Sequence, residues 1–74
     1  MTSDRLTIRG LASVGLLLRV VNLLAQNDAV LRKVTAELGT DVMVIDIDMT
    51  ILPDMTRATL VNKLHSLVEV AEVN

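Results

Sequence analysis

The sequence predicts an α+β domain in which a four-stranded antiparallel sheet carries two helices on one face. Residues 6–9 and 43–51 alternate apolar and polar side chains, as half-buried strands do. Residues 16–26 and 60–68 have apolar residues three and four positions apart, the spacing of amphipathic helices. With 74 residues, the chain has room for one domain.

The N-terminal part should contain one strand and the loop that follows it. Leu6-Thr7-Ile8-Arg9 predicts the strand, with residues 1–5 as an N-terminal tail and residues 6–74 as the single domain. Gly10 should end the strand. Residues 11–15 favour a loop that leads into the first helix.

The first helix is expected from residue 16 to about residue 26, with Ser13 as a candidate N-cap. Its polar residues Arg19, Asn22 and Gln26 form one narrow stripe, and the rest of its surface is apolar. Asn27-Asp28 should end it, because both residue types tolerate the left-handed conformation.

The middle of the chain predicts two strands joined by a short turn. Residues 30–37 favour a strand through Val30, Val34 and Thr35, and residues 38–41 favour a turn. The next strand is the clearest in the chain, because its apolar residues occupy every second position. These residues are Met43, Ile45, Ile47, Met49 and Ile51.

The second helix should open at Pro53-Asp54, with proline in the first turn and an acid near the positive end of the helix dipole. Its apolar stripe would consist of Leu60, Val61, Leu64, Leu67 and Val68. Residues 69–73 predict a last short strand. The order of the six elements is that of the ferredoxin-like βαββαβ fold, which leaves one sheet face bare.

Composition indicates self-association. Apolar residues make up 51% of the chain, and there is no Phe, Tyr or Trp. With no cysteine and a single histidine, neither disulfides nor a zinc site can stabilise so small a core, which leaves oligomerisation. A homo-oligomer, dimer or larger, is therefore expected.

Charge and hydropathy argue against two classes of partner. The net charge is −2, and without aromatic residues there is no platform on which bases could stack, so no nucleic-acid partner is expected. Residues 11–25 are apolar, but Arg19 and Asn22 interrupt them and they are too short to span a membrane. A cytoplasmic location is expected.

The first strand and its loop, continuing through Val14-Gly15-Leu16-Leu17, resemble the ACT domain family, in which a Pro-Gly-hydrophobic turn leads into the helix. The resemblance covers residues 6–73. The tail, residues 64–73, is similar to the end of the small regulatory subunit of acetolactate synthase. The resemblance implies a non-catalytic regulatory or assembly module in amino-acid metabolism. Its copies would pair side by side, or it would dock on a larger catalytic subunit.

Members of that family bind an effector amino acid at the loop after the first strand, next to a neighbouring subunit. Carried over to this chain, the effector-binding residues are Leu11, Ala12, Ser13, Val14, Gly15 and Leu16. Gly15 would let a ligand approach the backbone, and the free amides at the start of the helix can hold a carboxylate. An amino-acid sensor is therefore the alternative function.

Three departures put effector binding in doubt. Ala12 stands where effector-binding members carry Asp or Asn, and Val14 replaces the proline before the glycine. After the first helix, where a glycine and a ligand-contacting asparagine are common in the family, this chain reads Asn27-Asp28-Ala29-Val30. A bound amino acid would lose the side chain that receives its ammonium group, so a degenerate effector site is at least as strongly indicated.

Asp46 and Asp48 raise an enzymatic alternative, because Asp-x-Asp-x-Thr after a hydrophobic strand resembles the first motif of haloacid dehalogenase-type phosphatases. Those enzymes place the motif at the end of a strand in a large parallel sheet, which 74 residues cannot build. The favoured interpretation puts both carboxylates on the solvated face of an amphipathic strand. His65 is expected to be solvated or to lie at the edge of the apolar stripe of the second helix. No catalytic residue, metal ligand or cofactor is predicted.

Overall fold

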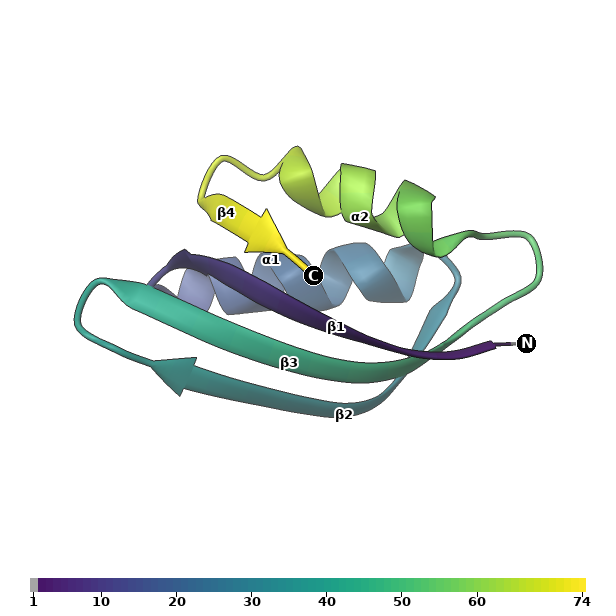
Figure 1. Ribbon diagram of the computed structural model, residues 1–74, viewed down its shortest axis with the longest axis horizontal. Coiled ribbons are helices and arrows are strands. Elements are labelled where there is room, and N and C mark those ends of the chain that lie inside the picture. Colours follow the sequence, from purple (N-terminus) through teal and green to yellow (C-terminus); the bar gives the residue numbers. More distant parts are fainter. Residues whose placement is uncertain (1) are drawn as a thin grey trace.

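The computed structural model describes residues 2–74, with side chains from residue 3 onward, and contains six elements (Figure 1). They are β1 (Thr2–Leu11), α1 (Val14–Gln26), β2 (Ala29–Leu38), β3 (Val42–Ile51), α2 (Arg57–His65) and β4 (Val70–Val73). Their order confirms the predicted ferredoxin-like α+β fold. Within residues 2–74, no helix is both long enough and apolar enough to cross a membrane.

The four strands form one antiparallel sheet in the order β2-β3-β1-β4, so β2 and β4 are its two edges. β1 and β3 pair along their full length at the centre, from Thr2 opposite Ile51 to Leu11 opposite Val42. α1 packs against β2 and α2 packs against β4. Both helices cover the same face of the sheet, and the other face is open.

The core lies between the helices and the covered face of the sheet. The predicted apolar face of β3 is buried throughout its length: Met43, Ile45, Ile47, Met49 and Ile51. The helices contribute Leu16, Val20 and Leu24 from α1, and Leu60 and Leu64 from α2. Every fully buried side chain in the described part of the chain is aliphatic, because burying a polar group without a partner would be costly.

β1 is longer than the sequence indicated. Residues 3–5, expected within an N-terminal tail, continue the strand and lie opposite residues 48–50 of β3. Ser3 and Asp4 have low strand propensity. The unpaired backbone groups of the central strand nevertheless require partners, and this pairing supplies them.

The helix boundaries correct two expectations. α1 begins at Val14, two residues early, with Ser13 as its N-cap as predicted. The prediction that Pro53-Asp54 opens α2 was wrong: both residues lie in a turn, and Thr56 caps the helix by accepting a hydrogen bond from the Thr59 amide at 3.2 Å.

The predicted apolar stripe of α2 is correct only up to its last member. Leu60 and Leu64 are buried, and Leu67 is partly buried after the helix has ended at His65. Val68 lies beyond the helix and is 96% exposed. Because the helix ends at His65 and the chain then turns toward β4, Val68 no longer follows the helical spacing that places Leu60 and Leu64 in the core.

Candidate functional site

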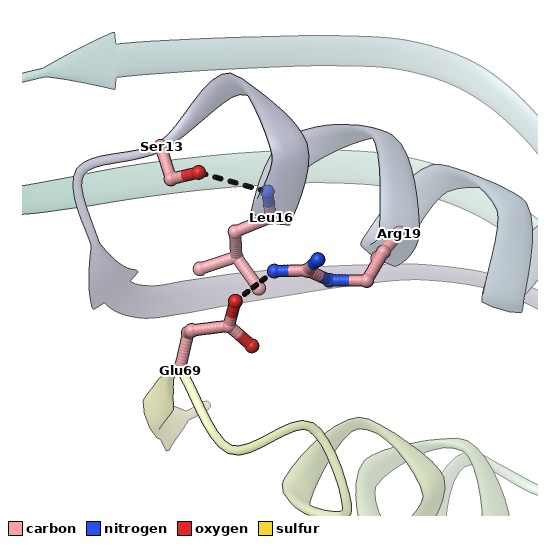
Figure 2. A network of polar contacts seen from close by, with 4 residues as sticks. All are labelled: Ser13, Leu16, Arg19 and Glu69. Carbon is pink, nitrogen blue, oxygen red and sulfur yellow. Dashed lines mark hydrogen bonds and ion pairs between the residues drawn. The ribbon is translucent and has the colours of Figure 1, made fainter.

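The six residues predicted to bind an effector lie where β1 turns into α1. Leu11 ends β1, Ala12 and Ser13 form the turn, and α1 starts at Val14. Ser13 accepts a hydrogen bond through its Oγ from the Leu16 amide at 3.3 Å (Figure 2). This cap satisfies one of the four amides that lack partners in the first turn of a helix.

The cap leaves the amides of Val14 and Gly15 at the tip of α1, where the helix dipole favours an anion. Both residues are exposed, and the first turn of α1 contains no acidic side chain that would compete for the amides. Leu16 is different, because its side chain is fully buried in the core. The tip can therefore accept a carboxylate through backbone amides alone.

Ala12 connects this turn to the hairpin between β2 and β3. Its amide donates to the Asp41 carbonyl oxygen at 3.1 Å, and its methyl group is partly buried against the core. The side-chain position at which effector-binding relatives would carry a carboxylate or an amide is thus occupied by a packed methyl group. The side chain of Ala12 cannot accept a hydrogen bond from an ammonium group.

A groove of 580 Å³ opens beside the turn, at the junction of β1, the start of β3 and the segment that leads into β4. Leu11, Val42 and Val68 are its exposed apolar residues. Asp41, Glu69 and Glu72 line it together with the single base Arg9. The groove therefore combines an apolar floor with an excess of carboxylates.

Of the six predicted effector residues, only Leu11 lines this groove. The two anion-binding amides at the tip of α1 and the carboxylate-rich groove are thus separate features. A small amino acid needs both kinds of group within one pocket to fix its two charges, and the lining of the groove supplies only the carboxylates.

Sequence reasoning missed Val42, Val68 and Glu69 as neighbours of the site. Val68 was assigned to the apolar stripe of the second helix, and Val42 fell between the predicted turn at residues 38–41 and the predicted strand at residues 43–51. No spacing in the sequence links these residues, because they meet only through the pairing of β1 with β3 and with β4.

Gly10 allows β4 to approach the end of β1. A Cβ atom at this position would lie 2.5 Å from the Glu69 carbonyl oxygen and 2.7 Å from a methyl carbon of Leu16. Only glycine fits between the backbone and the core here. By contrast, a Cβ on Gly15 would meet nothing closer than 3.4 Å, so the structure does not require glycine at that position.

Glu69 also forms an ion pair with Arg19 of α1, shown in Figure 2. Arg19 projects from the flank of α1 that faces α2. A polar depression of 390 Å³ continues along this flank between the two helices. Its lining residues include Asn22 and Gln26 of α1 and Lys63 of α2.

The carboxylates of the phosphatase-like motif lie on the open face of β3, in the middle of an antiparallel sheet. Asp46 accepts a hydrogen bond from the Thr7 hydroxyl at 2.8 Å. Asp48 lies opposite Arg5 on β1 and Lys33 on β2. Asp46 thus has a hydrogen-bonded partner across the sheet, and Asp48 lies between two basic residues of the neighbouring strands. The motif lies within an antiparallel sheet, whereas the phosphatases that it resembles place it at the end of a strand in a parallel sheet.

The described residues contain no cluster of three or more His, Cys, Asp or Glu side chains that could hold a metal ion. His65, the single histidine of the chain, is exposed at the end of α2.

Solved structures of other proteins have the same fold. The ACT domain from GTP pyrophosphokinase of Chlorobium tepidum matches with a TM-score of 0.83 and 15% identity, over 97% of this chain and 94% of that one. The C-terminal domain of the MgtC protein from Mycobacterium tuberculosis matches with a TM-score of 0.74 and 19% identity, over 97% and 82% of the two chains. A formyltetrahydrofolate deformylase from Pseudomonas putida KT2440 has a TM-score of 0.81 and 14% identity, over 99% of this chain and 28% of the deformylase.

No family model and no curated protein matches the sequence. At these identities the structural similarities establish the fold alone. This chain is thus a small domain with the fold of an ACT domain, over nearly its whole length.

Proposed function

We propose that the chain is a non-catalytic regulatory or assembly module of the ACT type, which acts in amino-acid metabolism by docking on itself or on a larger catalytic subunit. The observation that carries the proposal is the fold, which matches an ACT domain of an enzyme over nearly all of both chains. Asp46, which accepts a hydrogen bond from Thr7, and Asp48, which lies opposite two basic residues, support a role without catalysis.

Assembly is favoured over sensing by the geometry of the β1–α1 turn. The helix tip offers amides for a carboxylate, while the ammonium-binding position is the packed methyl of Ala12. Exposed apolar residues are instead prominent at the groove and along α1, among them Leu18 and Val68. Such side chains are better suited to contact protein surfaces than to hold a zwitterion.

The tail of residues 64–73, similar to the small regulatory subunit of acetolactate synthase, suggests which enzyme to test first. A tagged chain expressed in its native cells should co-purify an acetolactate synthase catalytic subunit in near-stoichiometric amount, identified by mass spectrometry. The tag expressed alone is the control. Recovery of the chain with no enzyme of amino-acid metabolism, under conditions that preserve known enzyme complexes, would contradict docking on a catalytic subunit.

The second candidate is an amino-acid sensor, which is favoured by the free amides of Val14 and Gly15. Calorimetric titration with valine, leucine, isoleucine and serine distinguishes the two functions. We expect no binding tighter than about 1 mM, which corresponds to about −4 kcal/mol. The Ala12→Asp variant tests whether a restored carboxylate strengthens binding. Micromolar affinity in the unmodified protein would make sensing the primary function.

A further inference from the structure

The groove of 580 Å³ beside the β1–α1 turn has an apolar floor that is open to solvent. Leu11 and Val42 lie directly opposite each other, at the end of β1 and the start of β3, and are 56% and 51% exposed. Met43, the neighbour of Val42, is buried on the covered face, so Val42 and Leu11 lie on the open face of the sheet. Val68 completes the floor from the segment before β4 (Figure 1).

Backbone contacts hold the walls of this groove in place. The Leu11 amide donates to the Glu69 carbonyl oxygen at 3.0 Å, which joins the end of β1 to the segment before β4. The Ala12 amide donates to the Asp41 carbonyl oxygen, which joins the β1–α1 turn to the β2–β3 hairpin. Gly10 permits the first contact, because a Cβ atom there would lie 2.5 Å from the Glu69 carbonyl oxygen. The groove is therefore preformed, and binding need not order it first.

The carboxylates that line the groove outnumber its bases. Glu69 is paired with Arg19 of α1. Glu72 lies opposite Arg9, the single base of the lining. Asp41 is exposed and forms no ion pair with the side chains of residues 3–74. An unbalanced negative charge therefore lies next to the apolar floor.

A second hollow continues the groove across the end of the sheet. It has a volume of 400 Å³, and Arg9 and Val42 line both hollows. Val44 and the carboxylate of Glu37, which lies opposite it on β2, belong to its lining. Glu37 is exposed and, like Asp41, has no ion pair among the described side chains. We call the two hollows together the sheet-end groove, in which aliphatic side chains alternate with free carboxylates.

This pattern fits a protein segment that carries aliphatic and basic side chains together. We propose that the sheet-end groove binds a segment of a partner protein in which Lys or Arg is next to Leu, Ile or Val. The aliphatic side chain packs on Leu11, Val42 and Val68, and its basic neighbour reaches Asp41. Lys and Arg suit the groove because their apolar stems can lie along the floor while their charged ends stay at the carboxylates.

The charge of the groove selects against other segments. An acidic segment would bring its carboxylates next to Asp41, Glu72 and Glu37, and like charges repel. A purely aliphatic segment would cover Asp41 without giving it a partner, which costs free energy because the carboxylate loses water. A basic segment without aliphatic residues would gain only the weak attraction of exposed ion pairs. Tight binding therefore requires both parts of the partner segment.

This inference deepens the proposed function, on whose docking role it rests, by naming the docking surface and the chemistry of the partner segment. Fluorescence anisotropy of the chain with three labelled peptides tests it. The first peptide carries the run Leu-Lys-Leu-Lys between glycine-serine flanks. The second has glutamate in place of lysine, and the third has serine in place of leucine. The first should bind at least about tenfold more tightly than either of the others.

Two pairs of variants locate the binding surface. Asp41→Lys should weaken binding of the first peptide by about tenfold or more, because it reverses the charge that receives the lysine. Asp54→Lys makes the same change of charge in the turn before α2 and should change binding by less than about twofold, since distant exposed charges are screened. Val68→Ser should weaken binding by about threefold or more through lost apolar contact. Val30→Ser, at an exposed position of β2 outside the groove, should have no effect. Circular dichroism verifies that all variants are folded.

Equal binding of the three peptides overturns the inference. Equal losses in Asp41→Lys and Asp54→Lys also overturn it, because the peptide would then respond only to the net charge of −2. A second copy of the chain in the groove is a further contrary outcome, in which Val68→Ser lowers self-association in sedimentation equilibrium and leaves peptide binding unchanged. The peptide assay uses the chain alone, whereas enzyme co-purification tests the proposed function, so the failure of one can be told from the failure of the other.

Discussion

The two flanks of α1 belong to one helix of thirteen residues and have opposite chemistry. The flank toward α2 carries Arg19, Asn22 and Gln26, and Arg19 is paired with Glu69. The flank toward β2 carries the stripe of Val14, Leu18, Val21 and Ala25. Between them lies the buried face, Leu16, Val20 and Leu24, which anchors the helix to the sheet.

The difference distinguishes the flank of α1 that contacts another element of the chain from the flank that does not. The flank toward α2 meets another element of the chain, and one of its polar residues, Arg19, forms an ion pair with Glu69. The total accessible surface, 4477 Å², is close to the roughly 4,500 Å² typical of a compact monomer of this mass. The fold therefore buries about as much surface as is typical of a compact monomer of this mass. The large apolar residues that remain exposed lie on α1, on β2 and around the groove: Val14, Leu18, Val30, Val34, Leu38, Leu11, Val42 and Val68.

The largest loss in the free energy of unfolding is expected for a substitution on the buried face of α1, between the two flanks. Leu24→Ala removes a fully buried side chain and should lower the free energy of unfolding by about 2–5 kcal/mol. Leu18→Ala is the matched control on the same helix and should cost less than about 1 kcal/mol in the dilute monomer, because Leu18 is exposed there. Urea denaturation at low protein concentration measures both. Equal losses would mean that Leu18 belongs to the monomer core.

Two variants, each with a new charge on one flank of α1, test which flank takes part in self-association. Tm should rise with protein concentration in the unmodified chain and in Asn22→Glu, because association stabilises the folded state. In Leu18→Glu this dependence should disappear, since the added carboxylate would have to be buried at the interface. Each 1 kcal/mol of lost association free energy should lower Tm by about 4–8 °C. The same concentration dependence in both variants would show that the apolar flank is not an interface.

The smallest change in the free energy of unfolding is expected for a substitution on the polar flank of α1. Arg19→Ala removes the ion pair with Glu69, and exposed pairs contribute about 0–1 kcal/mol. The difference from the unmodified protein should shrink in about 1 M NaCl, where the Debye length is about 3 Å. Chemical denaturation by urea at both salt concentrations measures it. A loss that is large and insensitive to salt would indicate that Arg19 holds α2 and β4 in place by packing instead.

The candidate site could be predicted from the sequence only in part. Ser13 was recognisable as a cap, because a hydroxyl before an apolar helix has a local partner three residues ahead. The groove was not recognisable, since Leu11, Val42 and Val68 come from three segments that are distant in the chain. The effector residues themselves remain a prediction. The turn that carries them has a methyl group at Ala12, where effector binding would need a carboxylate or an amide.

By itself the sequence determined the order of the six elements, the buried face of β3 and the turn at Asn27-Asp28. These features arise from alternation, helical spacing and turn chemistry over a few neighbouring residues. Tertiary structure decided the extension of β1 into residues 3–5, the late start of α2 at Arg57 and the exposure of Val68. It also decided which flank of α1 lies beside a free sheet edge. Those outcomes depend on backbone pairing and packing between segments far apart in the chain, which no local pattern encodes.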